Sequence, residues 1–324
     1  MADDTSSPDQ AATAAGRAGT VALVGRSNVG KSTILNAALA LPLAIVSHKP
    51  QTTRDRLLGI VRHRGAEIGL LDTPGLHRAE TRLGREMNRT ARAATREADV
   101  VVFVTAVPRP GPNSPKPHPA DHKLLGEIAA EVPVVLAINK IDLLGDKRLL
   151  LPLIAAYAAA HELRAIVPIS ALREDGVTLV LDEVVKLLPE GTGRHGEDDI
   201  TDRPLRWFAA EYVREAILEA TAQEVPHATA VTVDRFDEPV AGVEGVVEIA
   251  ATIHVERSGQ KRIVIGEGGQ VLKRVGTAAR IRIEELIERR VHLALWVRVT
   301  KDWRERPDQL ADFGLLANAG EGAG

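Results

Sequence analysis

Short apolar runs alternate with segments of helical periodicity between residues 20 and 188, and this alternation constrains the fold more than any other feature. The apolar runs are residues 21–24, 68–71, 100–104, 134–138 and 166–169. The helical segments that follow them are residues 31–41, 83–97, 121–131, 149–161 and 179–188. Uninterrupted apolar strands joined by helices are typical of a mostly parallel sheet. The sequence therefore predicts an α/β domain with helices on both faces of its sheet.

A second pattern follows a polar stretch that is rich in glycine and acidic residues. Helical periodicity returns at residues 206–221 and 270–289, strand-like alternation occurs at 228–236, 246–256 and 291–299, and 261–265 reads as a short strand. This order predicts a smaller α+β domain. We expect a disordered tail at 1–17, the α/β domain at 18–188, a linker at 189–204, the α+β domain at 205–306 and a C-terminal tail at 307–324.

Composition narrows the functional classes. The chain has no cysteine, which excludes disulfides, thiolate-ligated zinc and cysteine nucleophiles. Its longest apolar-rich stretch, residues 100–107, is shorter than the roughly 18–20 residues of a membrane-spanning helix. Because the first residues, Ala2-Asp3-Asp4, also lack signal-peptide chemistry, we expect a cytoplasmic protein. Residues 257–306 contain 13 Lys/Arg and 6 Asp/Glu, a balance of +7 that indicates an anionic partner.

A glycine-rich segment between the first strand and the first helix predicts a phosphate-binding loop. Its sequence, Gly25-Arg26-Ser27-Asn28-Val29-Gly30-Lys31-Ser32, matches G-x-x-x-x-G-K-[ST] in the structural context that this motif requires. The backbone N–H groups of such a loop wrap a β-phosphate at the start of the helix. We expect Lys31 to reach the β- and γ-phosphate oxygens and Ser32 to ligate Mg²⁺.

Two further segments are expected to sense the third phosphate. Asp72-Thr73-Pro74-Gly75 ends the strand at 68–71, so Asp72 can hold Mg²⁺ through water and the Gly75 N–H can contact a γ-phosphate. The segment Gln51-Thr52-Thr53-Arg54 precedes an apolar run at 57–61, and a threonine hydroxyl there completes the Mg²⁺ shell while a γ-phosphate is present. We favour Thr53 over Thr52.

The segment Asn139-Lys140-Ile141-Asp142 selects the base. It ends the strand at 134–138, at the edge of the sheet where open α/β folds bind ligands. The Asp142 carboxylate can accept hydrogen bonds from guanine N1–H and the 2-amino group, whereas adenine would leave it unpaired. We expect Asn139 to bridge neighbouring loops, the Lys140 stem to pack across the ring, and Ser170-Ala171 to supply a backbone donor to guanine O6.

The residue after Gly75 bears on catalysis. Leu76 occupies the position where Ras-like GTPases carry the glutamine that orients the attacking water, and leucine cannot form that hydrogen bond. We therefore assign no catalytic side chain with certainty, and expect Lys31, Thr53 and Gly75 to contact the phosphates and the transition state. Asn28 is a possible ligand for a K⁺ ion that bridges the phosphates, although it can also simply shape the loop.

The second domain carries a candidate RNA site. Gly266-Glu267-Gly268-Gly269 forms a G-x-x-G segment before a helix with basic residues at Lys273, Arg274 and Arg280. In KH modules such a loop clamps the sugar-phosphate backbone, and a neighbouring apolar groove takes unpaired bases. The alternative is a tight turn in a purely structural domain.

In this order, the nucleotide motifs and the G-x-x-G domain closely resemble the Era family of GTPases. The likeness extends over residues 20–316 and includes KPQTTR (49–54), DTPGLH (72–77), ITDR (200–203), GQK (259–261) and LWVRVTKDW (295–303). The resemblance implies a P-loop GTPase domain followed by a type II KH domain, in a monomer that binds the 3′ end of 16S rRNA and assists 30S subunit assembly. It also implies Mg²⁺ as cofactor and peripheral contact with the inner membrane.

Three departures from the family pattern stand out. Ser27 replaces a usual proline, Glu267 places a negative charge in the G-x-x-G loop, and residues 108–119 form a proline-rich loop. We expect Glu267 to weaken RNA binding by on the order of 1 kcal/mol. An alternative function is a GTPase whose basic C-terminal domain mainly engages a membrane or a protein partner. An ATP-driven enzyme is disfavoured by Asp142.

Overall fold

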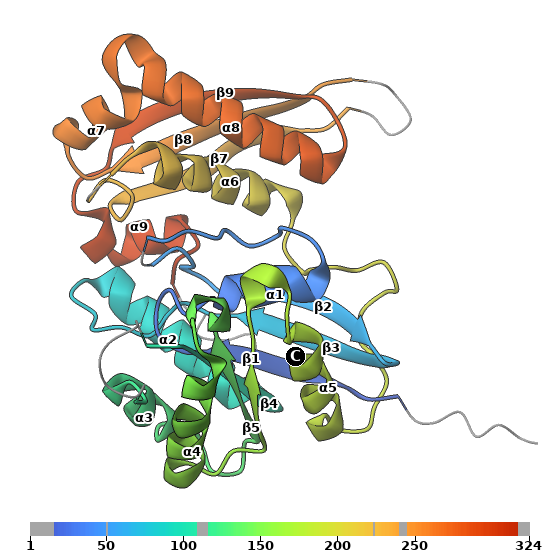
Figure 1. Ribbon diagram of the computed structural model, residues 1–324. Coiled ribbons are helices and arrows are strands. Elements are labelled where there is room, and N and C mark those ends of the chain that lie inside the picture. Colours follow the sequence, from blue (N-terminus) through green and yellow to red (C-terminus); the bar gives the residue numbers. More distant parts are fainter. Residues whose placement is uncertain (1–15, 50, 109–115, 223, 240–244, 317–324) are drawn as a thin grey trace, which may run out of the picture.

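The computed structural model describes residues 16–49, 51–108, 116–222, 224–239 and 245–316, which form two stacked domains (Figure 1). The N-terminal domain has a six-stranded sheet in the order β2-β3-β1-β4-β5-β6. Every neighbouring pair is parallel except β2 and β3. The strands are β1 (Ala18–Val24), β2 (Leu57–His63), β3 (Ala66–Asp72), β4 (Val100–Ala106), β5 (Val134–Asn139) and β6 (Ala165–Pro168). The predicted, mostly parallel sheet is confirmed.

Helices cover both faces of this sheet, as predicted. One face packs on α1 (Lys31–Leu39) and α5 (Val177–Leu187), and the other on α2 (Arg82–Glu97), α3 (Pro119–Leu125) and α4 (Leu150–Ala160). The helix expected at 121–131 is shorter than predicted, because the chain leaves the helix at Gly126 and continues in turns. Most of the proline-rich loop expected at 108–119 falls on residues 109–115, outside the described residues.

The second domain is the predicted smaller α+β unit. Its sheet has the order β7-β8-β9, antiparallel between β7 and β8 and parallel between β8 and β9. An apolar core joins this sheet to its helices through residues such as Val213, Val264 and Val275. The elements are α6 (Leu205–Ala220), β7 (Thr229–Asp237), β8 (Val247–Val255), α7 (Ser258–Ile265), α8 (Gln270–Ile287) and β9 (Val291–Val299).

The short strand predicted at residues 261–265 is wrong, since these residues belong to helix α7. A brief apolar run fits a strand and a helix equally well by periodicity alone. The helix is favoured by the Gln260 side chain, which accepts hydrogen bonds from the backbone N–H groups of Glu256 and Arg257 and thereby caps the first turn. The G-x-x-G segment therefore connects two helices rather than a strand and a helix.

Both chain ends of the described region are more ordered than predicted. Gly16 and Arg17 pair with the start of the linker, while residues 1–15 of the predicted tail lie outside the described residues. The C-terminal tail expected from residue 307 is wrong for helix α9 (Pro307–Asp312), whose Leu310 is fully buried. The signal is the apolar spacing of Leu310, Phe313 and Leu315, which pack around Trp303. Residues 317–324 lie outside the described residues.

Apolar contacts dock the two domains on each other. The core on the α1 and α5 face continues through Leu43 and Ala44 to Phe208 and Tyr212 of α6. A second cluster joins Leu83 and Met87 of α2 to Trp303 and Leu310. The predicted linker at 189–204 lies along the outer edge of β2, where Ile60 N–H donates to Ile200 O at 2.8 Å.

None of the helices described is both long and apolar enough to cross a membrane.

Candidate nucleotide site and RNA interface

A cavity of about 510 Å³ opens at the carboxyl end of the sheet, where the segments singled out in the sequence meet. The phosphate loop supplies one side, the segment at 45–53 a second, and the loop after β5 a third. Its lining residues are Ser27, Asn28, Gly30, Lys31, Ser32, Thr33, Ile45, Val46, Ser47, His48, Gln51, Thr52, Thr53, Gly75, Asn139, Lys140, Asp142, Leu143 and Leu172.

The phosphate loop is shaped by close backbone approach. Gly30 has φ 103°, and a Cβ atom there would lie 2.2 Å from Asn139 Nδ2, so only glycine fits. Lys31 begins α1 and its Nζ donates to the carbonyl oxygens of Gly25 at 3.2 Å and Arg26 at 3.1 Å. Burial lowers the pKa of Lys31 to about 8, against the opposing effect of Asp72. The cation thus lies at the mouth of the loop, where phosphate oxygens would replace the carbonyl groups. The Val29 side chain is buried in the core, so it can offer only its backbone.

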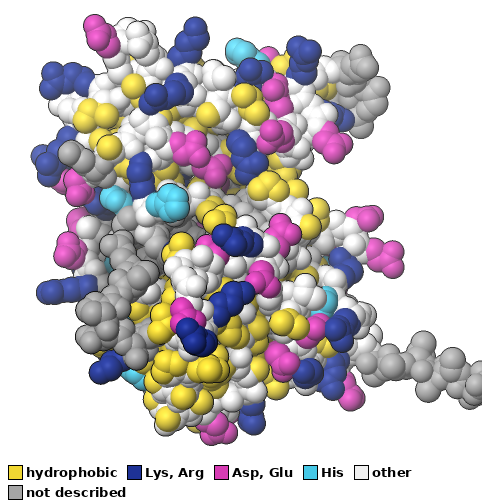
Figure 2. Space-filling view, in the orientation of Figure 1, with side chains coloured by type: hydrophobic (Ala, Val, Ile, Leu, Met, Phe, Trp, Pro, Cys, Tyr) yellow, Lys and Arg dark blue, Asp and Glu magenta, His cyan; other side chains and the backbone are white. Residues whose placement is uncertain are grey.

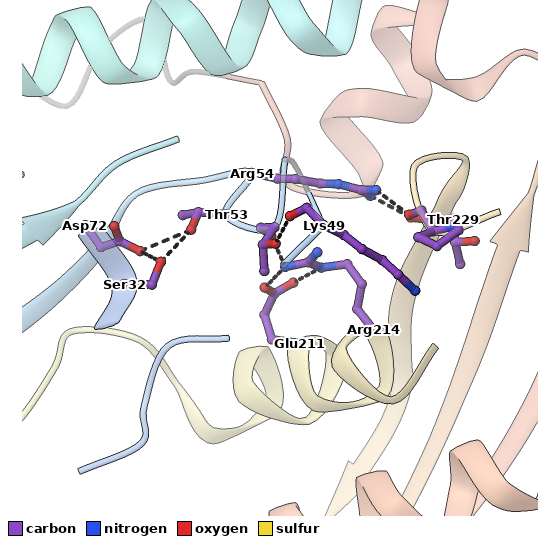
Figure 3. Close-up of polar contacts among 10 residues, drawn as sticks. Ser32, Lys49, Thr53, Arg54, Asp72, Glu211, Arg214 and Thr229 are labelled. Carbon is purple, nitrogen blue, oxygen red and sulfur yellow. Dashed lines mark hydrogen bonds and ion pairs between the residues drawn. The ribbon is translucent and has the colours of Figure 1, made fainter. Parts of the chain in front are cut away.

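Oxygen atoms of Ser32, Thr53 and Asp72 form a cluster (Figure 3). Ser32 Oγ donates to Asp72 Oδ2 at 2.6 Å, Thr53 Oγ1 lies 3.1 Å from the same oxygen, and the two hydroxyls are 3.0 Å apart. Asp72 is fully buried, which raises its pKa against the opposing effect of Lys31. Its Oδ1 has no hydrogen-bond partner among the described residues. Two hydroxyls and a buried carboxylate fit a hard divalent cation such as Mg²⁺.

Thr52 lies apart from this cluster. Its Oγ1 donates to Lys49 O at 2.7 Å, inside the loop itself. Thr53 is therefore the threonine that the fold brings to Asp72.

The segment after β3 is pressed against the phosphate loop. A Cβ atom on Gly75 would lie 2.5 Å from Ser27 Cα, so the two backbones touch. Leu76 N–H donates to Gly25 O at 3.1 Å, and Thr73 Oγ1 donates to Leu23 O at 2.7 Å. Pro74 and Leu76 are buried, so the Leu76 side chain offers nothing polar to a water molecule.

The base-selecting residues lie at the other end of the cavity. Ser170 Oγ donates to Asp142 Oδ1 at 2.6 Å, which orients the carboxylate. Asn139 bridges loops, as expected: its Nδ2 donates to Val29 O at 2.8 Å and its Oδ1 accepts from Ala171 N–H at 3.0 Å. Of the two backbone N–H groups from which we expect a donor to guanine O6, that of Ala171 donates to Asn139 and that of Ser170 donates to Asp175 O at 2.9 Å. Lys140 Nζ donates to Asn28 O at 2.6 Å, so its stem spans the cavity.

Apolar residues outside the sequence motifs also line the cavity wall, two of them beside the base-selecting Asp142. Leu143 and Leu172 are 58% and 77% exposed and flank Asp142, where the ring face of a base would cover them. Each directly follows a predicted base-binding segment, so its position in the chain was the available signal.

The segment at 49–54 also binds the second domain (Figure 3). Lys49 Nζ donates to the carbonyl oxygens of Leu218 and Thr221 at the end of α6. Arg214 of α6, held by Glu211, donates to Thr52 O at 2.6 Å. We call Lys49, Thr52 and Arg54, with the residues that they contact in the second domain, the interdomain latch.

Arg54 of the latch is buried between the two domains. Its guanidinium donates to the carbonyl oxygen of Thr229 (2.5 Å) at the start of β7, and to those of Pro226 (2.9 Å) and His227 (3.2 Å) in the preceding loop. Among the described residues it makes no ion pair within 4.0 Å, and it lies 5.8 Å from the Trp303 ring centroid. Burial lowers the pKa of Arg54 to about 9, helped by Arg214, so the side chain remains a cation at neutral pH.

The G-x-x-G segment lies at one end of a groove between α8 and β9. A Cβ atom added to Gly268 or Gly269 would meet no other atom within 4 Å, so their backbone is open to a ligand, and Glu267 is exposed beside them. Lys273 and Arg280 line the groove, together with Leu272, Gly276, Thr277, Val291, His292, Leu293 and Leu295. Arg274 instead donates to Ala220 O of α6 at 2.9 Å and is absent from the groove lining. Figure 2 shows Lys and Arg side chains around the second domain with acidic ones between them.

Two family descriptions match the chain. Residues 20–140 match the 50S ribosome-binding GTPase family and residues 224–304 match the KH domain. GTPase Era of Geobacter metallireducens is 46% identical over 299 residues, which cover 92% of this chain and 97% of that protein. The chain belongs to the Era family of GTPases. As in other members of that family, a P-loop GTPase domain precedes a KH domain.

Solved Era structures agree with both domains. An Aquifex aeolicus Era variant bound to GDP and AlF4⁻ is 39% identical, with a TM-score of 0.87 over 93% of this chain and 100% of that one. Era in complex with MgGDPNP and nucleotides 1506–1542 of 16S ribosomal RNA has the same identity, coverage and TM-score.

Proposed function

We propose that this chain is a GTP-hydrolysing switch that binds the 3′ end of 16S rRNA through its KH domain and assists assembly of the 30S subunit. The observation that carries the proposal is the shared segment at 49–54. Thr53 lies in the oxygen cluster of the nucleotide site, while Lys49, Thr52 and Arg54 contact the KH domain.

The phosphate end of the cavity supports GTP with Mg²⁺. The loop from Gly25 to Ser32, including Arg26, Ser27, Asn28 and Val29, would wrap the β-phosphate, with Lys31 reaching the β- and γ-phosphates. Ser32, Thr53 and Asp72 would hold Mg²⁺, which neutralises phosphate charge when bound. Mg²⁺ with a GTP analogue is present in the related Era complex.

The base end supports guanine. Asp142, oriented by Ser170, accepts two hydrogen bonds from the guanine edge, and Leu172 and the Lys140 stem cover its faces. Hydrogen bonds to a charged group contribute about 1.5–3 kcal/mol each, enough to reject adenine strongly.

Hydrolysis requires a substitute for the missing glutamine. Asn28 lies on the cavity wall, and its Nδ2 donates to His48 O at 2.9 Å. Amide and carbonyl oxygens suit a monovalent cation, and we expect K⁺ to accelerate turnover with Asn28 as a ligand. Equal GTP turnover in K⁺ and Na⁺ buffers would remove this part of the proposal.

The groove between α8 and β9 supports single-stranded RNA. The open backbone of Gly268 and Gly269 can approach phosphates, whereas Gly266 is packed against Val271. Lys273 and Arg280 supply charge, and Leu272, Leu293 and Leu295 offer an apolar floor for bases. Arg274 faces α6 instead, so we give it the smaller share of RNA affinity.

We also propose a monomer that acts in the cytoplasm with only peripheral contact to the inner membrane. The family resemblance supports this, and light scattering and vesicle flotation test it.

The test of the main proposal is filter binding of a 16S 3′-end oligonucleotide with GDPNP, GDP or no nucleotide. We expect RNA affinity to change at least 5-fold between GDPNP and GDP, since coupling between sites typically amounts to about 1–3 kcal/mol. Tighter binding to anionic vesicles than to this RNA would favour the membrane alternative.

A further inference from the structure

A buried polar cluster lies behind the phosphate loop, outside the nucleotide cavity. Its centre is Asp121 of α3, which is fully buried. Asp121 accepts hydrogen bonds from Arg26 Nε at 2.7 Å, from Thr105 Oγ1 at 2.7 Å and from Tyr157 OH at 3.0 Å. These donors come from the phosphate loop, the end of β4 and helix α4.

A buried carboxylate is costly unless it is paired and hydrogen-bonded. Thr105 and Tyr157 supply neutral hydrogen bonds, whereas Arg26 supplies the compensating charge. The Arg26 side chain is 26% exposed, so it reaches inward from the loop surface to Asp121. The ion pair therefore joins the phosphate loop to helix α3, which packs on the face of the sheet opposite α1.

Arg26 occupies a sensitive point of the loop. Its carbonyl oxygen accepts from Lys31 Nζ at 3.1 Å, and its backbone forms a bridge with Leu76, beside the γ-phosphate-sensing segment. Fixing the Arg26 side chain fixes the peptide that both Lys31 and Leu76 touch.

The Arg26–Asp121 ion pair also offsets the repulsion between Arg26 and Lys140. Burial lowers the pKa of Lys140, Asp142 opposes this, and the nearby Arg26 cation lowers it further. Lys140 Nζ also donates to Asn28 O in the phosphate loop. Without Asp121, the Arg26 and Lys140 cations would repel each other beside the loop, and no anion would be paired with Arg26.

We infer that Asp121 is a positioning residue for the phosphate loop. It acts through Arg26 and holds the loop in the conformation that receives the β-phosphate. The inference rests on the proposed GTP function and adds a residue that lies outside the loop and the nucleotide cavity.

The test compares Asp121→Asn with two controls that spare the ion pair. Asp121→Asn keeps the shape of the side chain but removes its charge, and GDP affinity should fall on the order of 10-fold. Tyr157→Phe and Thr105→Val each remove one neutral donor from the same carboxylate, and GDP affinity should stay within about 2-fold of the parent. Arg26→Gln, at a partly exposed site, carries the test if Asp121→Asn does not fold.

Two further readouts separate positioning from general stability. Arg26→Gln combined with Asp121→Asn should weaken GDP binding no more than either change alone, because both break one interaction. The ³¹P NMR resonance of the β-phosphate of bound GDP should shift in both single variants and stay in place in Tyr157→Phe. Additive losses, an unmoved resonance, or equal losses in the controls would overturn the inference. Failure of the parent protein to bind GDP would instead refute the proposed function.

Discussion

Arg54 offers the sharpest test of the interdomain latch. Its three hydrogen bonds to backbone carbonyls come from a charged donor and contribute about 1.5–3 kcal/mol each. Burial, helped by the Arg214 charge, lowers the pKa of Arg54 to about 9, so the cost of burying the cation offsets part of this gain. We expect a net contribution on the order of 2 kcal/mol, equivalent to about 30-fold in an equilibrium constant.

The perturbation is Arg54→Ala, and the assay is fluorescence anisotropy of a labelled 16S 3′-end oligonucleotide with GDPNP or GDP bound. We expect the ratio of the two RNA affinities to fall by up to about 30-fold toward 1. Without the Arg54 hydrogen bonds, a change at the neighbouring Thr53 in the nucleotide site is no longer transmitted to the KH domain. GTP affinity should stay within about 3-fold of the parent, since Arg54 is absent from the lining of the nucleotide cavity.

A matched control lies two residues away. The Arg56 side chain pairs with Glu97 of α2 at 3.0 Å, on the surface of the GTPase domain. Arg56→Ala should leave the affinity ratio unchanged, since exposed ion pairs contribute little. An unchanged ratio in Arg54→Ala, or an equal loss in both variants, would refute the latch.

Three other substitutions test the separate sites. Lys31→Ala should abolish nucleotide binding in an equilibrium titration with a fluorescent GDP analogue, and retained affinity would remove the phosphate-loop assignment. Asp142→Asn should shift preference from guanine to xanthine nucleotides in competition binding, because the amide can donate to the xanthine 2-oxygen; an unchanged preference would show that the base is selected elsewhere. Gly268→Asp should lose RNA binding at least 10-fold while GTP turnover continues, since a carboxylate would occupy the open backbone of the G-x-x-G loop; intact RNA binding would contradict the clamp.

Local patterns in the sequence predicted most of the sheet and the nucleotide motifs. The phosphate loop is encoded within eight residues. Asp72 and Asp142 could be identified as site residues because they lie at or shortly after the end of a strand. Because parallel strands place their carboxyl ends at one edge, sequence alone could bring Ser32, Asp72 and Asp142 to the same edge of the sheet.

Contacts between distant segments could not be predicted in the same way. Helix α7 was mistaken for a strand because its short apolar run fits both periods, and its cap depends on Gln260. Helix α9 is stabilised by Trp303 and Phe313, a tertiary cluster with only a weak sequence pattern.

The partners of Arg54 and Asp121 lie far from them in sequence, so no spacing rule reveals them. Arg54 binds carbonyl groups more than 170 residues away, and Asp121 pairs with Arg26 across 95 residues. The hydrogen bond of the Ala171 N–H could not be predicted for another reason. Guanine O6 and the Asn139 side chain were both possible acceptors, and in the structure the N–H donates to Asn139.

Calorimetric titration of GDPNP with Mg²⁺, with and without the 16S 3′-end oligonucleotide, tests the central claim most directly. Thermodynamic linkage requires that RNA change GDPNP affinity by the same factor by which GDPNP changes RNA affinity. We predict binding heat in both titrations and a shift of at least 5-fold in affinity with RNA, a shift that Arg54→Ala reduces. Binding heat that is absent, or an affinity that RNA leaves unchanged, would contradict a nucleotide switch coupled to the KH domain.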